Sequence, residues 1–267
     1  TISYGFVRWP QALETRLKYQ SVLVDIAAYL KDQPVDAPVF ADGFYRPITA
    51  DSLRRDLGED PGGRWIQTGE TVSGAIVLPS EGEGSLIVPE FAAPDERLRA
   101  LAGVPAEPLV RSDDRPSFAV YNLPARHQVA ELPQPLPFED TLSLVGYEIT
   151  TPQDGQALQI VTAWQVDGEL PDDLAIFVHW LDGEGKLISQ HDGFDAAPGT
   201  LRPGDVVIQR HVLPWTSTLP TPIGSLHVGL YHREDGRRLN VIDDAGNTVD
   251  HLVFPLDEAL SKGNYGE

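Results

Sequence analysis

Seven histidines and several acidic turns are the side chains of this chain with the clearest capacity for chemistry, because the sequence contains no cysteine. The histidines are His127, His179, His191, His211, His227, His232 and His251. No two of them have the His-Glu-x-x-His spacing of a helical zinc site, and no thiolate is present to complete one. We therefore predict no metal site at the histidines, no disulfide and no cysteine nucleophile.

Acidic residues gather in short turns. Asp182 and Glu184 lie in the sequence DGEG, and Asp243 and Asp244 lie in DDAGN. Calcium binds carboxylate and carbonyl oxygens supplied by such loops. Asp-Gly is also the strongest short signal for a hairpin, because the turn requires positive φ. We predict ordinary turns and no cofactor, with Ca²⁺ at these four residues as the alternative.

The aromatic residues Trp164, Trp180, Trp215 and Tyr231 lie within or beside apolar runs of the second half. Exposed on one face, they would form a platform on which a sugar stacks. Tryptophan and tyrosine also fill the cores of β-sandwiches, where the polar atom of each ring finds a partner. These four residues are our carbohydrate-binding candidates, although packing in the sandwich core is the favoured interpretation.

Other catalytic and nucleotide-binding signatures are missing. VFADGFYRP has one glycine where a phosphate-binding loop needs several, and there is no G-x-S-x-G for acyl transfer. Asp42 ends a predicted strand, the position where α/β folds place ligands, although we favour a helix-capping or turn role for it. A glycosidase needs two carboxylates across a cleft, and no pair stands out among 40 acidic residues. We predict no catalytic residue in this chain.

The formal net charge is −20, which argues against nucleic acid and against an anionic membrane surface as partners. No apolar run is long enough to cross a bilayer, so we predict no direct membrane insertion by this chain. The charge is uneven. Residues 1–130 hold 18 acidic and 13 basic residues, and residues 131–267 hold 22 and 7. This asymmetry predicts two domains with different surfaces.

The first half mixes helical and strand-like patterns. Apolar residues recur every three or four positions over 11–31, and helices are also predicted over 48–58 and 93–103. Strands are predicted over the segments 38–42, 64–67, 74–79, 85–90, 108–112 and 117–124. This mixture predicts a small α/β sandwich domain over 1–125.

The second half has a different pattern. A proline-rich segment at 126–140 predicts a linker, since proline removes backbone donors and favours extended chain. Apolar runs that alternate with polar residues then follow, with Gly, Asp and Pro turns between them, which predicts an antiparallel β-sandwich over 141–260. A polar tail completes the chain at 261–267. The predicted fold is α+β and multidomain, with an immunoglobulin-like or jelly-roll-like sandwich.

Several motifs together resemble a known family. Residues 4–30 resemble the point at which bacterial membrane glycosyltransferases of the GT-C superfamily, similar to dolichyl-phosphate-mannose-dependent mannosyltransferases, leave the membrane. The sandwich resembles the C-terminal domain of such proteins at Val145–Glu148, Trp164–Gln165, Asp173–Gly185, Gln190–Gly193, Pro203–Val207 and Val228–Leu239. The resemblance implies an extracytoplasmic region at the cell surface or in the periplasm, tethered through a preceding transmembrane domain of the same polypeptide. It transfers no catalytic residue, because the family's catalytic acids lie in the membrane domain.

Three functions follow as expectations. The first is a non-catalytic accessory region of a membrane glycosyltransferase that positions a glycan or a glycosylated acceptor. The second is a stand-alone secreted or surface module that binds carbohydrate or protein. The third is a hydrolase with a carboxylate pair at the cleft between the domains.

Overall fold

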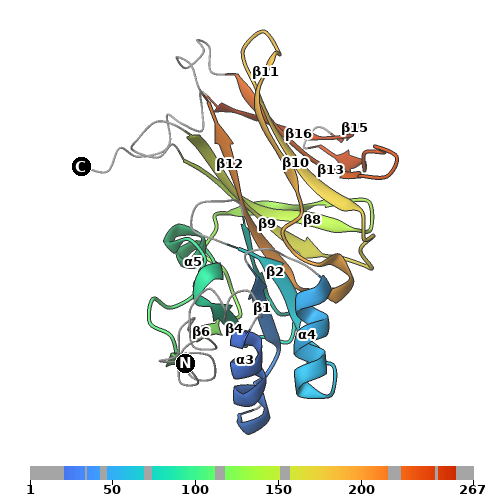
Figure 1. The fold of residues 1–267 in the computed structure, drawn as a ribbon. Coiled ribbons are helices and arrows are strands. Elements are labelled where there is room, and N and C mark those ends of the chain that lie inside the picture. The colour runs from blue at the N-terminus through green and yellow to red at the C-terminus, as the bar shows by residue number, and fades with distance from the viewer. Residues whose placement is uncertain are drawn as a thin grey trace, which may run out of the picture.

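The computed structural model describes residues 21–33, 35–42, 47–68, 74–111, 118–150, 157–215, 224–243 and 246–256. The chain is rich in β-structure, with three sheets and a few short helices (Figure 1). This arrangement confirms the α+β class predicted from the sequence.

A five-stranded sheet forms the first layer, in the order β2-β1-β4-β6-β5. Its strands are β1 (Pro38–Asp42), β2 (Arg64–Gln67), β4 (Gly84–Pro89), β5 (Val110–Arg111) and β6 (Phe118–Leu123). β1 runs parallel to both β2 and β4, and the other pairs are antiparallel. The bounds of β1 and β2 are those expected from their apolar runs.

Helices cover this sheet, and side-chain alternation decides which residues they meet. α3 (Ser21–Asp32) and α4 (Pro47–Leu57) pack on Phe40, Trp65 and Ile87, whereas Val39 and Leu86 point to the main core. A 3₁₀ turn, η2 (Glu90–Ala92), precedes α5 (Glu96–Leu101). A helix forms within the predicted range 93–103 but is shorter, since Asp95 caps its start and Gly103 follows it with a φ of 75°. The first half of the helix predicted over 11–31 lies outside the described residues.

Two antiparallel sheets form the rest of the molecule (Figure 1). Both sheets contribute buried residues to one hydrophobic cluster. The seven-stranded sheet has the order β15-β14-β7-β8-β9-β12-β3, and the four-stranded sheet has the order β11-β10-β13-β16. The seven strands are β3 (Gly74–Leu78), β7 (Glu131–Phe138), β8 (Leu142–Thr150), β9 (Ala157–Val166), β12 (Val206–Pro214), β14 (Val241–Ile242) and β15 (Thr248–Val249). The four strands are β10 (Leu174–Leu181), β11 (Leu187–Gly193), β13 (Ser225–His232) and β16 (Leu252–Pro255).

Strand β3 joins the two halves of the chain. The sequence pattern assigned it to the α/β half, but it pairs antiparallel with β12 from Val206↔Leu78 to Arg210↔Gly74. All five residues of β3 are buried, so the strand fits the edge of a larger covered sheet. Because a continuous apolar run carries no information about its partner, the sequence alone could not assign this strand to a sheet.

The segment predicted as a linker contains a strand. β7 occupies residues 131–138 and pairs with β8, with an irregular register between Glu131 and Leu136. Its prolines alternate with other residues, so they point to solvent while Leu136 and Phe138 are buried. Pro133 and Pro135 are tolerated because they lie where the pairing is interrupted, whereas Pro137 lies in the paired part, opposite Ser143. The segment predicted as a linker therefore forms a strand of the seven-stranded sheet over these residues.

The loop after β11 attaches the four-stranded sheet to the α/β layer. The Gln67 amide donates to the Asp195 carbonyl at 2.8 Å, and Ile66 forms an isolated antiparallel bridge with Ala196. The Trp65 amide donates to Thr200 Oγ1 at 3.1 Å, just beyond the bridge, where the chain forms a 3₁₀ turn, η3 (Pro198–Thr200). The loop therefore serves as an added partner for β2.

Candidate functional site

Two of the predicted sugar-stacking residues belong to the core. Trp164 is completely buried, and its ring meets Phe138 edge-on with centroids 5.6 Å apart. Trp180 is also buried and meets Trp215 edge-on at 5.2 Å. Buried rings offer no face to a ligand, so Trp164 and Trp180 serve as packing residues.

The other two aromatic candidates are partly exposed but lie apart. Trp215 packs its half-buried ring against the core at the end of β12. Tyr231 lies on the outer side of the four-stranded sheet, where its ring centroid is 6.2 Å from that of Phe177. The four candidates therefore do not share one platform, and Tyr231 alone lies on an outer sheet face.

The acidic turns use their carboxylates to hold the backbone. Asp182 Oδ1 accepts from the amides of Glu184 and Lys186, each at 2.9 Å. Asp243 Oδ1 accepts from the Asn247 amide at 2.8 Å, and Asp244 lies outside the described residues. Among the residues that the structure describes, no group of three or more His, Asp or Glu is arranged to hold a metal ion. Asp42 ends β1, with its side chain outside the described part.

Strand register brings three histidines together on the outer side of the four-stranded sheet. His179 on β10 lies directly opposite His227 on β13, and directly paired residues point to the same side of a sheet. The His227 ring stacks on His251, just before β16, with centroids 4.5 Å apart and planes 15° apart. We call His179, His227, His251 and Tyr231, together with the buried Phe177 ring that supports them, the outer histidine face.

Paired charges surround the outer histidine face. His179 Nε2 lies 3.0 Å from Asp192 Oδ1, and Asp250 contacts His251 Nδ1 at 2.5 Å. Arg238 stands over the Phe177 ring with its guanidinium carbon 4.6 Å from the centroid, and its Nη1 donates to Asp250 Oδ2 at 3.1 Å. Imidazole, carboxylate and guanidinium groups thus alternate over a few ångströms on one surface.

These contacts set the charge on the face. Hydrogen bonding from His251, aided by Arg238, lowers the pKa of Asp250 below its ordinary value and keeps the carboxylate ionised. Burial lowers the pKa of His227, and the neighbouring His251 and His179 lower it further. Near neutral pH the face therefore presents a neutral imidazole beside an Arg–Asp pair. It offers both donors and acceptors without a large net charge.

A groove lies beside this face, between the edges of the two sheets. Its volume is about 710 Å³, and His251 lines it together with Leu132, Tyr147, Val253 and Phe254. The ring centroids of Tyr147 and Phe254 lie 4.4 Å apart across the sandwich. The groove supplies apolar ring surface next to the polar groups of the outer histidine face, the usual composition of a small-ligand site.

A second polar group lies inside the sandwich. His211 on β12 is completely buried, with Nε2 3.0 Å from Thr162 Oγ1 and Nδ1 2.9 Å from His191 Nδ1. Thr162 also accepts from Trp164 Nε1 at 2.8 Å. Burial holds the pKa of His211 well below 6.5, and His191 lowers it further. This series of hydrogen-bonded side chains links β9, β12 and β11. Because His211 is inaccessible to solvent, the series contributes to the core.

One carboxyl group has an unusual acidity. Burial raises the pKa of Asp195 to about 6, although Arg233 opposes the shift, and Asp195 Oδ2 is buried without a hydrogen-bond partner. The Asp195 amide donates to Gln209 Oε1 at 2.9 Å. Because its carbonyl accepts from the Gln67 amide of β2, Asp195 lies where the loop after β11 meets both the α/β layer and β12.

The three histidines of the outer histidine face are visible in the sequence, but nothing in the sequence shows that they lie together. The signal is the alternating pattern of β10 and β13, which places His179 and His227 on a polar side of each strand. Their proximity depends on the pairing register, and the position of His251 depends on the path of the chain after β15. A search for fixed local spacings could not find this arrangement.

Comparisons with protein-family models, with curated proteins and with solved structures found no match to this chain. Over the described ranges, no helix is long and apolar enough to span a membrane.

Proposed function

We propose that this chain is a non-catalytic binding region that holds a glycan, or the glycan of a glycosylated acceptor, at the outer histidine face and its groove. One observation carries the proposal: polar side chains in donor–acceptor pairs border a groove lined by aromatic rings. Sugars present apolar C–H faces and hydroxyls that both donate and accept. Aromatic rings beside Arg, Asp and His match both properties.

The state of the carboxylates supports binding over hydrolysis. Asp250 is held ionised by His251 and Arg238, so it is unsuited to donate a proton to a leaving group. Asp192 is paired with His179. A glycosidase requires one carboxyl with a raised pKa facing a second one, and these two carboxylates have basic partners instead.

The resemblance to GT-C glycosyltransferases supplies the wider proposal. In that setting the chain is the extracytoplasmic C-terminal region of a membrane enzyme and positions its glycan or acceptor. The finer proposal for the sandwich is an immunoglobulin-like or jelly-roll-like fold, supported by a chain that crosses repeatedly between two antiparallel sheets. A stand-alone secreted or surface module remains the alternative, and the reading frame around residue 1 distinguishes the two.

The test is direct binding. The chain is screened against an immobilised glycan panel, and the affinity for the best ligand is measured by calorimetry. We expect His251→Ala to weaken glycan binding at least about tenfold, because the loss of one hydrogen bond to a charged group reduces the binding free energy by about that much. His127→Ala is the matched control, because His127 lies in the segment before β7 and does not line the groove. Equal affinity of the two variants, or no ligand in the panel, contradicts the proposal.

One observation favours the hydrolase alternative enough to test it. Asp195 has the raised pKa that a general acid needs, and it lies where the α/β layer meets the sandwich. The charged side chain that acts on the pKa of Asp195 is Arg233, a base and not a second carboxylate. We expect no hydrolysis of a broad glycoside panel by the wild-type chain. Hydrolysis that Asp195→Asn abolishes would replace the binding proposal.

A further inference from the structure

The three imidazoles of the outer histidine face have unequal partners. His179 Nε2 lies 3.0 Å from Asp192 Oδ1. His251 Nδ1 lies 2.5 Å from Asp250 Oδ1. His227 lies on the strand between these two histidines, and within the described ranges no carboxylate forms an ion pair with it. A proton on either of the other two imidazoles therefore has a carboxylate beside it, whereas a proton on the middle imidazole has none.

Basic groups face His227 from every strand packed against it. His179 faces it from β10, in direct register. The His251 ring stacks on it from the residue before β16, and Arg238 acts on it from the chain after β13. Of the charges that act on His227, only Asp250 favours the protonated ring, and this carboxylate is already bonded to His251 and Arg238. The partly exposed His227 ring is therefore open to protons from solvent but poorly compensated when it binds one.

The stack of His227 and His251 depends on the charges of the two rings. Their centroids lie 4.5 Å apart and their planes 15° apart. Aromatic rings pack favourably at such distances while they are neutral. Histidine ordinarily gains its charge between about pH 8 and pH 5. When both rings are charged, the stack becomes a contact between two cations, and like charges at this separation repel.

His251 connects this stack to the groove. It lines the groove beside Tyr147 and Phe254, and 26% of its side chain is exposed. A His251 ring that leaves the stack therefore changes the wall of the groove. His227 itself changes as a ligand partner, because a neutral imidazole has one acceptor nitrogen and a protonated imidazole has none. Both changes act against a bound molecule that donates hydroxyl groups.

We propose that mild acid releases the ligand of the outer histidine face, with His227 as the group that senses the pH. This inference rests on the proposed function, since it concerns the same site and the same class of ligand. Near neutral pH, His227 is an uncharged acceptor and the stacked His251 ring holds the groove wall. At about pH 5 the protonated His227 repels His251 and Arg238, and the ligand loses both the acceptor and the wall.

The first measurement compares affinities at two pH values. Calorimetry at about pH 7.5 and about pH 5 uses mannotriose, maltotriose and N-acetylchitotriose, which carry no titrating group, so any pH dependence belongs to the protein. We expect the probe that binds to be at least about threefold weaker at the lower pH, because the apparent Kd rises as the fraction of neutral His227 falls.

Two variants identify the sensing group. His227→Gln cannot bind a proton in this range, so the ratio of its affinities at the two pH values should be about one, whatever its absolute affinity. His232→Gln makes the same change on the same strand, at a histidine with its own carboxylate, Asp173, 3.0 Å away. This control should keep the ratio of the unmodified chain. Equal affinity at both pH values, or a pH dependence that survives in His227→Gln, overturns the inference and leaves the proposed function standing.

The second measurement needs no ligand. Proton–carbon NMR of the ring Cε1–H groups follows the histidines of the free chain with pH, and the variants assign the signals. We expect the His251 signal to shift together with the protonation of His227 and to lose that shift in His227→Gln, while the His232 signal keeps its own titration. Independent titration of His227 and His251 overturns the inference. Failure of all three probes to bind at either pH instead contradicts the proposed function, and with it the release of a ligand.

Discussion

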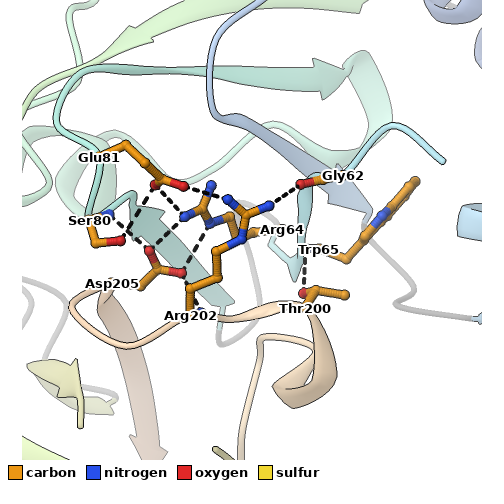
Figure 2. Close-up of polar contacts among 8 residues, drawn as sticks. All are labelled: Gly62, Arg64, Trp65, Ser80, Glu81, Thr200, Arg202 and Asp205. Atoms are coloured by element: carbon orange, nitrogen blue, oxygen red, sulfur yellow. Dashed lines mark hydrogen bonds and ion pairs between the residues drawn. The ribbon is translucent and has the colours of Figure 1, made fainter. Parts of the chain in front are cut away.

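Arg64 and Asp205 form a bidentate ion pair, although they lie 141 positions apart in the chain (Figure 2). Both side chains are completely buried. The pair joins the start of β2 to the loop that enters β12. Asp205 also accepts from the amides of Ser80 and Arg202, at 2.9 and 2.8 Å. One carboxylate thus fixes the positions of the α/β layer, the turn after β3 and the edge of the seven-stranded sheet.

Removing this carboxylate should strongly destabilise the chain. Asp205→Ala leaves the Arg64 guanidinium buried beside Glu81 alone, and loss of one partner of a buried pair costs about 3–5 kcal/mol. Urea unfolding measures the change. Arg202→Ala is the control, because Arg202 is exposed and its pair with Glu81 is worth at most about 1 kcal/mol. A cost below about 1 kcal/mol for Asp205→Ala would show that water or a shift of Glu81 replaces the pair.

The buried hydroxyl of Thr162 should contribute more than its size suggests. Thr162→Val keeps the shape but removes the acceptor for Trp164 Nε1 and the partner of His211 Nε2. Each buried group left unpaired costs about 1–3 kcal/mol. Thr248→Val on exposed β15 makes the same chemical change in solvent and should have little effect. Equal unfolding free energies for the two variants would contradict the hydrogen-bond chain.

The pH dependence of stability has two opposing sources. His191 and His211 have folded pKa values below 6.5, so they bind protons more weakly in the folded state. Their contribution is present above about pH 6.5 and is lost as the pH falls below it. Asp195 has a folded pKa of about 6, above its ordinary 3.8, so it takes up a proton on folding as the pH falls through that range. Its protonation partly offsets the histidine loss.

Variants resolve the two contributions. Urea unfolding at about pH 7 and about pH 5 gives the slope of stability with pH. We expect His211→Gln to flatten the loss toward acid, since the titrating core imidazole is gone. We expect Asp195→Asn to steepen the loss, because the offset is removed. Unchanged slopes in both variants would mean that other groups control acid unfolding.

A glycine holds the geometry of the outer histidine face. A Cβ added at Gly229 would lie 2.5 Å from Phe177 Cζ and 3.0 Å from the Asp250 carbonyl oxygen, closer than atoms pack. Gly229→Ala should therefore displace the Phe177 ring beneath Arg238 and cost about 1–3 kcal/mol, with weaker glycan binding. At Gly199 the nearest atom to an added Cβ is 3.5 Å away, so Gly199→Ala is the control. Thermal unfolding and the glycan affinity together decide the outcome.

Local sequence patterns determined much of the secondary structure. The runs PVFAD and RWIQ became β1 and β2 with the expected bounds, and α5 formed within the predicted range 93–103. Asp182 and Asp243 form hydrogen bonds within their turns, as hairpin chemistry requires. These features depend on neighbours in sequence, because alternation, capping and turn geometry act over a few residues.

Only the tertiary structure decided which strands pair and which side chains meet. The sequence could not reveal that β3 pairs with β12, that His179 lies opposite His227, or that Arg64 meets Asp205. Each relationship joins distant segments, and its register follows from how three sheets share one core. The alternation of β7 was present in the sequence, but its prolines obscured it, since proline penalises a strand only where the ladder needs an N–H. Pairing between distant segments is a property of the whole packed chain, and the local pattern of any one strand is compatible with several partners.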